Sequence, residues 1–300
     1  MASTRRAFLE GLAAVAGSTV LTPVSALFAR ADGWTQDVAP SPDVNEFLKR
    51  IRKAEQGAWA AKPIGDLVAE VGLSFLGFPY VAHSLEQPGE EQLVINLQAF
   101  DCMTFVENVL ALSRCIKRGT KNFPDFSLQL QTIRYRGGVI DGYPSRLHYS
   151  TDWVGDNQKK GIVRDVTKEL GGLRYMKTIN YMSTHADSYR QLSNRSYLRL
   201  IKAAETRLSA QRKHFLPKKR LQVLHTGLSN GDVIGITTSI KGIDIAHMGV
   251  VVESDGVTKF LHAPLSGGMV EVSAGSLGEY LEAHPSHTGI VVARPLEPGR

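Results

Sequence analysis

Cys102 and the two histidines His247 and His262 are the residues of this sequence with the clearest potential for chemistry. Cys102 follows Asp101 at the start of the apolar segment "FDCMTFVENVLAL". Aspartate caps helices, so we expect Cys102 in a first helical turn, where free backbone N–H groups and the helix dipole favour a thiolate. The pKa of such a thiol is expected to fall below about 8.5, which would make it a nucleophile. The alternative interpretation is a small buried apolar residue, the usual role of a lone cysteine.

His247 and His262 lie in the β-rich segments "HMGVVVES" and "TKFLHAP", separated by the hairpin signal Asp255-Gly256. If these two residues form a two-residue turn, Gly249 pairs with His262, and His247 becomes a diagonal neighbour of His262 on the same face. Diagonal Cβ atoms are about 7–8 Å apart or less, within reach of two imidazoles. His262 could then orient His247 as a base. A turn longer by one residue would place the two histidines on opposite faces.

The elements that must position these residues follow a simple order. Helices are expected in "PDVNEFLKRIRKAEQ", in "KPIGDLVAEVGLSFLG" and from Asp101 onward, where the apolar pattern predicts a central core helix. Short β-rich runs follow from Leu228, with a short helix in "SLGEYLEAH". Helices followed by a consecutive antiparallel sheet predict an α+β fold. If Cys115 shares a helix with Cys102, the two lie roughly 20 Å apart, too far for a disulfide, and Cys115 is interpreted as packing.

Charge is distributed unevenly along the chain. The net charge is +6, but residues 155–225 carry 16 Lys and Arg against 5 Asp and Glu. We interpret this stretch as a basic, mostly helical insertion that favours acidic partners such as cell-wall carboxylates, or as a solvated basic face. Neither an RNA-binding aromatic signature nor zinc-finger spacing is present, so no nucleic-acid partner is expected.

The N-terminus indicates export. The segment "STRRAFLE" and the small apolar run after it predict an export signal over residues 1–31, with Arg5-Arg6 typical of a twin-arginine route. A simple membrane anchor is the alternative. Residues 32–42 are interpreted as a linker and 43–300 as one catalytic domain, located in a bacterial periplasm or outside the cell. Contact with the export machinery would be transient, and no other segment is apolar enough to span a membrane.

The strings "LGFPY", "DCMTFVEN", "LSNGDVIGI", "HMGVVV" and "FLHAP", in this order, resemble the NlpC-type papain-like amidases and peptidases of bacterial cell walls. "YRGGVIDGYPSRLHYSTDW" resembles more specifically the N-acetylmuramoyl-L-alanine amidase-like branch. The resemblance covers most of the chain after about residue 45. It implies a papain-like α+β core, with the nucleophile helix packed on an antiparallel sheet, and hydrolysis of an amide in peptidoglycan muropeptides. It makes Cys102 the nucleophile, His247 the base, His262 the third polar residue, and Tyr80 a tyrosine directed at the nucleophile.

Ten further residues are predicted to bind substrate or its surroundings. Arg134, Arg136 and Arg146, within or directly before the string "YRGGVIDGYPSRLHYSTDW", could clamp peptide carboxylates or be solvated loop charges. The aromatic residues Tyr149 and Trp153 of this string could stack on a sugar or pack the loop. The full set is Asp101, Arg134, Arg136, Asp141, Tyr143, Arg146, His148, Tyr149, Asp152 and Trp153. No cofactor and no metal are expected, because His284 and His287 have poor zinc spacing. The alternatives to an amidase are a stem-peptide endopeptidase, a non-catalytic wall-binding module and, third, a zinc amidase.

Overall fold

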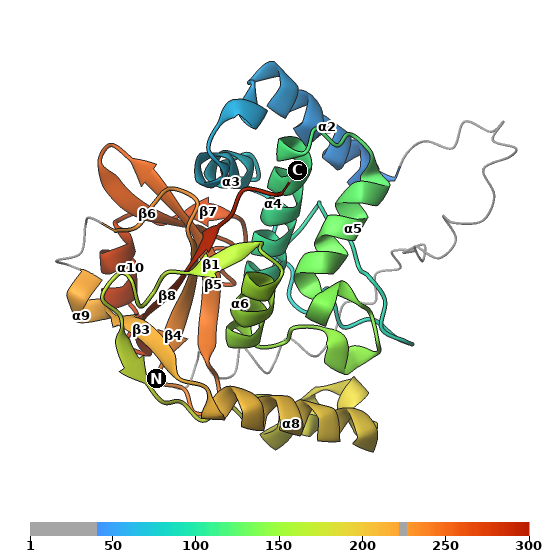
Figure 1. Ribbon diagram of the computed structural model, residues 1–300, viewed down its shortest axis with the longest axis vertical. Helices are drawn as coiled ribbons and strands as arrows, with labels where there is room; N and C mark the ends of the chain where they lie inside the picture. The colour runs from blue at the N-terminus through green and yellow to red at the C-terminus, as the bar shows by residue number, and fades with distance from the viewer. Residues whose placement is uncertain (1–40, 222–226, 300) are drawn as a thin grey trace, which may run out of the picture. The chain divides into compact units, whose positions relative to one another are not determined.

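The helices and the sheet form an α+β arrangement, as the sequence predicts (Figure 1). The structure, a computed structural model, describes residues 41–221 and 227–299. The predicted export signal, and all of the linker except its last two residues, lie outside the described residues. None of the described helices is both long enough and apolar enough to cross a membrane.

The helices of the first half form where the sequence supplies caps and apolar stripes. They are α2 (Pro42–Gln56), α3 (Ile64–Leu73), α4 (Cys102–Lys117), α5 (Phe123–Arg134) and α6 (Ser150–Lys159). Side chains of Ser41, Asp101 and Asn122 accept hydrogen bonds at the starts of α2, α4 and α5. From Thr104 to Ile116 every residue of α4 is buried, because α3, α5 and the sheet surround it. α4 is therefore the central helix that its apolar sequence predicts.

The sheet forms mainly from the C-terminal β-rich runs. Its strands there are β4 (Val233–Thr238), β5 (Ile245–Ser254), β6 (Val257–His262), β7 (Glu271–Val272) and β8 (His287–Pro295), with α10 (Leu277–Glu282) before β8. Strands β4 to β7 pair consecutively and antiparallel, as predicted. The last strand departs from this order: β8 pairs on the other side of β4, so β4 is an interior strand.

The basic stretch is less helical than predicted. It adds β1 (Val163–Asp165), β2 (Leu173–Tyr175) and β3 (Lys213–Pro217) to the sheet, and the order becomes β2-β3-β8-β4-β5-β6-β7 with β1 also on β8. The segment "KKGIVRDVTKEL", read as helical, contains β1, because Gly161 adopts a positive φ of 66° after α6 and the next residues pair with β8.

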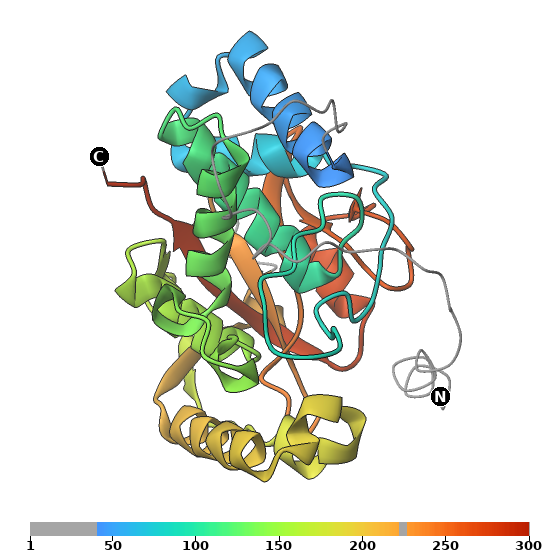
Figure 2. The ribbon, with the colours of Figure 1, turned by 90° about the vertical axis from the view of Figure 1, so that its right-hand side faces the viewer.

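The helix predicted for "SYLRLIKAAETRL", in the same basic stretch, is confirmed: this segment lies within α8 (Arg195–Ala210). The short helices α7 (Tyr181–Thr184) and α9 (Lys218–Leu221) flank it, and single 3-10 turns occur at 59–61, 136–138, 143–145, 186–188 and 190–193. Both ribbon views place α8 at the opposite end of the described residues from α2 (Figures 1 and 2).

Candidate active site

Cys102 is the first residue of α4, and Asp101 caps this helix as predicted. The Thr104 N–H donates to Oδ1 of Asp101 at 2.7 Å, and the Asp101 N–H donates to Oγ1 of Thr104 at 2.9 Å. This reciprocal pair fixes the first turn and directs the backbone N–H groups of that turn toward the cysteine. The carboxylate of Asp101, predicted to bind substrate, is used by the helix itself.

The two histidines lie on one face, and the predicted hairpin register is confirmed. Gly249 pairs with His262, and Ser254 pairs with Val257. Nε2 of His247 lies 2.8 Å from Nδ1 of His262, a hydrogen-bond distance. The Phe260 ring stacks on His262, with ring centroids 4.7 Å apart. The ring pair is therefore held in one orientation, and Nδ1 of His247 is the nitrogen left for another partner.

Backbone contacts bring the thiol to the same part of β5. The backbone N–H of Met248, the residue that directly follows His247, lies close enough to the Cys102 sulfur to favour its thiolate, as do the N–H groups of Cys102 and Met103. These contacts connect the beginning of α4 to the strand that carries the proposed base. The structure thus brings Cys102, His247 and His262 into one neighbourhood from segments about 150 residues apart.

The prediction of a lowered thiol pKa is wrong for this structure. Burial and, after it, the nearby Asp101 carboxylate raise the pKa of the Cys102 thiol to about 12, and the three backbone N–H groups only partly offset these two effects. A helix N-terminus favours a thiolate, but the protein groups packed around the sulfur reduce its hydration, although Cys102 as a whole is only partly buried. In this state the cysteine is a neutral thiol.

Both histidines are neutral as well. Burial holds the pKa of His247 well below its ordinary value, and the neighbouring histidines lower it further. Burial and the nearby His284 lower the pKa of His262 to about 4. The arrangement therefore suits a base that takes the thiol proton as the thiol attacks, rather than a preformed thiolate–imidazolium pair.

Two tyrosines lie close to the thiol. Burial and then Cys102 raise the pKa of Tyr80, whose backbone N–H donates to the Gly268 carbonyl at 2.8 Å. Tyr280 of α10, which the sequence analysis missed, packs its ring edge on His262 with centroids 4.9 Å apart. Burial and then Cys102 raise its pKa to about 12. No motif marks Tyr280, because it reaches the site only through the packing of α10 on β6.

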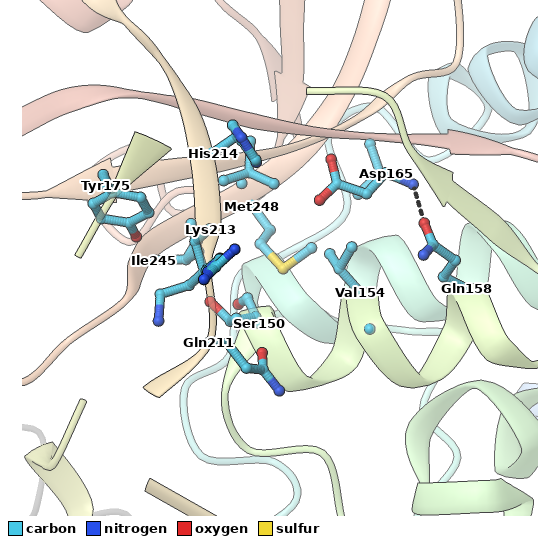
Figure 3. A pocket seen from close by; sticks show the side chains of 16 residues that line it. Ser150, Val154, Gln158, Asp165, Tyr175, Gln211, Lys213, His214, Ile245 and Met248 are labelled. Atoms are coloured by element: carbon cyan, nitrogen blue, oxygen red, sulfur yellow. Dashed lines mark hydrogen bonds between the residues drawn. The ribbon is translucent and has the colours of Figure 1, made fainter. Parts of the chain in front are cut away.

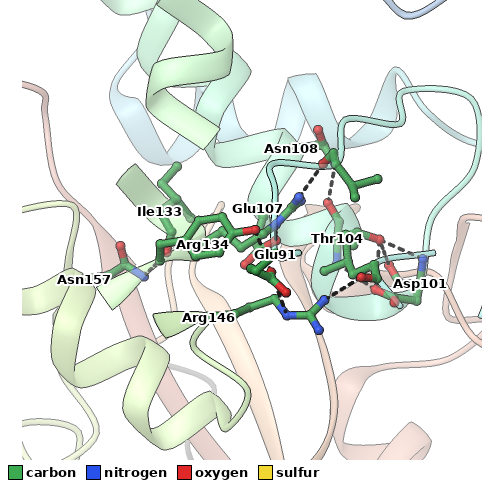
Figure 4. A network of polar contacts seen from close by, with 12 residues as sticks. Glu91, Asp101, Thr104, Glu107, Asn108, Ile133, Arg134, Arg146 and Asn157 are labelled. Atoms are coloured by element: carbon green, nitrogen blue, oxygen red, sulfur yellow. Dashed lines mark hydrogen bonds and ion pairs between the residues drawn. The ribbon is translucent and has the colours of Figure 1, made fainter. Parts of the chain in front are cut away.

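Arg134 and Arg146, predicted as substrate clamps, lie in a buried polar network (Figure 4). Nε of Arg134 lies 2.6 Å from Oε2 of Glu107, and the two side chains are 1% and 2% exposed. Arg146 pairs with Glu86 at 2.6 Å and Glu91 at 3.4 Å. Both guanidinium groups already meet carboxylates of the chain, so this structure uses them to hold the loops around α4.

The aromatic residues of the same string are also packed inside. Trp153 and Tyr143 are fully buried. The hydroxyl of Tyr149 donates to Oε1 of Glu205 at 2.7 Å, which ties the α6 region to α8. Nε2 of His148 lies 2.8 Å from the Tyr143 carbonyl oxygen. Of the two readings of Tyr149 and Trp153, loop packing is the one that this structure shows.

Arg136, Asp141 and Asp152 line an open groove of about 650 Å³ between residues 136–159 and α8. Asp152 pairs with Arg136 at 2.8 Å and with Arg207 at 3.1 Å. Of these three predicted substrate residues, Arg136 and Asp141 remain accessible on this face, whereas Asp152 is buried beneath the two arginines. Cys102 does not line the groove.

A second, smaller cavity of about 130 Å³ lies beside β5 (Figure 3). Met248 and Ile245 form part of its wall, together with Ser150, Tyr175 and Lys213. Neither Cys102 nor His247 faces it. His284 and His287 do not line this cavity; they lie beside Tyr280, on whose ring His262 also packs. Across residues 41–221 and 227–299, no three or more His, Cys, Asp or Glu side chains are grouped to hold a metal ion.

The α+β fold therefore holds a capped cysteine beside a hydrogen-bonded pair of histidines. Residues 70–291 match the family described as AmiA-like, N-acetylmuramoyl-L-alanine amidase-like. The chain belongs to the N-acetylmuramoyl-L-alanine amidase-like family. No curated protein matches the chain.

A solved amidase structure agrees with this assignment, and two further solved structures share the fold. An N-acetylmuramoyl-L-alanine amidase from Bacteroides uniformis is 39% identical, and the alignment covers 78% of this chain and 99% of that one, with a TM-score of 0.73. A Bacteroides fragilis protein whose name proposes a xylanase is 39% identical over 75% of this chain and 99% of that one, with a TM-score of 0.71. A Legionella pneumophila protein shares the fold at 22% identity, over 84% and 94%, with a TM-score of 0.64.

Proposed function

We propose that this chain is an exported cysteine amidase that hydrolyses the amide between N-acetylmuramic acid and L-alanine in peptidoglycan muropeptides. One observation carries the proposal: the Cys102 sulfur lies near the Met248 N–H, next to His247, whose Nε2 is 2.8 Å from Nδ1 of the buried His262. A nucleophile, a base and a group that orients the base are the parts that thiol-dependent amide hydrolysis requires. Family membership and the Bacteroides uniformis amidase support the choice of bond.

The proposed reaction begins with proton transfer from the Cys102 thiol to Nδ1 of His247 as the sulfur attacks the amide carbonyl. The backbone N–H of Cys102, together with the Tyr80 hydroxyl, would stabilise the oxyanion. The imidazolium then protonates the amine of L-alanine, which leaves, and the lactyl group of the sugar remains as a thioester on Cys102. Water, deprotonated by His247, hydrolyses the thioester and restores the thiol.

The wider setting is part of the same proposal. A papain-like core of the NlpC type would place the nucleophile helix against the sheet, and α4 packs on β5 in this way. A peptidoglycan substrate requires a location outside the cytoplasm, which the predicted signal in residues 1–31 would provide. The name of the Bacteroides fragilis structure raises the alternative of a glycosidase. Such an enzyme would need two free carboxyl groups on either side of the scissile sugar bond. Asp152, in the open groove, is instead paired with two arginines.

The test is mass spectrometry of defined muropeptides after incubation with the protein. Freed intact stem peptide is expected, Cys102→Ala should abolish its release, and Cys115→Ala, a change at the second cysteine, should retain it. Cleavage within the stem peptide would select the endopeptidase instead. No cleavage at all, or full turnover by Cys102→Ala, would refute the cysteine amidase.

The basic stretch supports a second proposal, docking on the polyanionic cell wall. α8 exposes Arg195, Arg199 and Lys202 within two turns. Changing Arg199 and Lys202 to Glu should weaken sedimentation with insoluble wall as added salt does, because exposed charges are screened beyond a Debye length of about 8 Å. Turnover of a small soluble muropeptide should not change. Lost turnover with unchanged sedimentation would contradict docking.

A further inference from the structure

Glu271 on β7 lies beside the histidine pair, although no sequence motif marks it. We propose that Glu271 is a positioning residue that fixes the protonation pattern of His262 and, through it, of His247. The inference rests on the proposed function, because it assigns Glu271 a part in the same Cys102 chemistry. It concerns a residue that touches His262 and not the substrate.

The geometry of β6 and β7 places Glu271 at the far side of the pair. His262 and Glu271 are opposite each other in the antiparallel register. Oε1 of Glu271 lies 3.9 Å from Nε2 of His262, a buried atom with no hydrogen-bond partner in a residue that is 1% exposed. A buried polar atom without a partner is energetically unfavourable, so a nearby acceptor that can reach it stabilises the protein. The Glu271 side chain is 43% exposed, so it has the freedom to rotate across the short remaining distance.

The hydrogen bond between the two rings makes the protonation pattern matter. A neutral imidazole carries one proton, on either nitrogen. His247 can accept the thiol proton at Nδ1 only if its own proton is on Nε2, where it is donated to Nδ1 of His262. Neutral His262 then carries its proton on Nε2, the unpartnered atom that faces Glu271. A carboxylate at that position accepts this N–H and so selects the productive pattern for both rings.

Charge gives Glu271 a second effect on the same step. When the thiol proton reaches His247, the ring pair becomes positive, and a carboxylate beside His262 stabilises that charge without taking the proton. The other titratable groups around His262 are Tyr280 and His284, from α10 and the turn after it, and His247 on β5. None of these is a carboxylate. Among the described groups around His262, Glu271 is therefore the one that supplies a carboxylate to the histidine pair.

The loop before β7 leaves room for this carboxylate. A Cβ added at Gly267 would lie 2.5 Å from Oε2 of Glu271 and 2.8 Å from its Cδ. Alanine at this position would therefore displace the flexible carboxylate while leaving the strands in place. Gly267→Ala offers a way to move Glu271 without changing it.

The experiment measures kcat and KM for muropeptide hydrolysis across pH. Glu271→Ala should lower kcat at least about tenfold with little change in KM. Glu271→Gln should lose less, because its amide oxygen still accepts the His262 N–H. Added formate should partly restore Glu271→Ala, and Gly267→Ala should reproduce its loss. The matched control is Glu253→Ala, an exposed glutamate at the far end of β5, which should keep wild-type kcat.

The outcomes separate this inference from the proposed function. Full activity in Cys102→Ala would overturn both. If Cys102→Ala is inactive and Glu271→Ala matches the Glu253→Ala control, the cysteine mechanism stands and the role of Glu271 is refuted. The role of Glu271 would also be refuted if the loss of kcat in Glu271→Ala were not restored by added formate, were equally large in Glu271→Gln and were absent from Gly267→Ala. That pattern would indicate a structural defect.

Discussion

Replacing Arg134 with Met should destabilise the protein without weakening substrate binding. The guanidinium lies 2.6 Å from Glu107, both side chains are almost completely buried, and a second donor of Arg134 bonds the Val94 carbonyl. Removing one partner of a buried pair leaves an uncompensated charge and costs about 3–5 kcal/mol. For a domain of this size, such a loss lowers the melting temperature by roughly 6–20 °C.

The assay combines urea unfolding with kinetics. Arg136→Met is the matched control two residues along, at an arginine that is 36% exposed and should contribute at most about 1 kcal/mol. A double variant, Glu107→Leu with Arg134→Met, should recover most of the stability, because neither charge then remains buried alone. At temperatures where the single variant is still folded, its KM should equal that of the wild type.

A different result would restore the interpretation of Arg134 as a substrate clamp. If Arg134→Met left the unfolding midpoint unchanged and raised KM, the guanidinium would be accessible to the substrate. The buried pair described above would then not represent the working enzyme. Failure of the double variant to regain stability would likewise refute the energetic reasoning.

Three further outcomes are expected. Cys115→Ser should keep its activity but lower the unfolding midpoint, because Cys115 is fully buried in the core and a hydroxyl there lacks its hydration; an unchanged midpoint would contradict this. Burial lowers the pKa of His287 to about 4, whereas the histidine of the unfolded chain titrates near 6.5. The unfolded chain therefore binds a proton that the folded protein does not, and the free energy of unfolding falls by up to about 3 kcal/mol as the pH drops from 6.5 to 4. The loss between pH 7.5 and 4.5, measured in urea, should be smaller in His287→Asn. Changing Arg5-Arg6 to Lys-Lys should retain the precursor in the cytoplasm, visible by fractionation, whereas normal export would exclude a twin-arginine route.

Local sequence patterns were sufficient to predict the two structural features that build the site, the capped start of α4 and the β5–β6 hairpin. Asp101 before an apolar run predicts a capped helix with Cys102 in its first turn, and capping depends only on neighbours three residues away. The turn residues Asp255-Gly256 set the hairpin register and hence put both histidines on one face, because side chains alternate along a strand. Family membership was also readable from the motifs.

Other features depend on partners that are distant in sequence. Burial, which raises the pKa of the Cys102 thiol, comes from elements packed over the sulfur and has no local signal. The interior positions of Arg134 and Arg146 depend on carboxylates at Glu107, Glu86 and Glu91. An arginine in a loop-like string reads as a solvated or ligand-binding charge until the acid that pairs with it is located in space.

The sequence by itself determined the start of α4, the hairpin, the α+β class and the family, because each rests on short-range geometry or on motifs. Only the tertiary structure decided that β8 pairs beside β4, that the basic stretch adds strands to the sheet, and that Tyr280 and Glu271 lie at the histidine pair. Strand order and the contacts of α10 and β7 arise from packing between segments far apart in the chain. No residue in those segments encodes its distant neighbour, so these contacts follow from the fold as a whole.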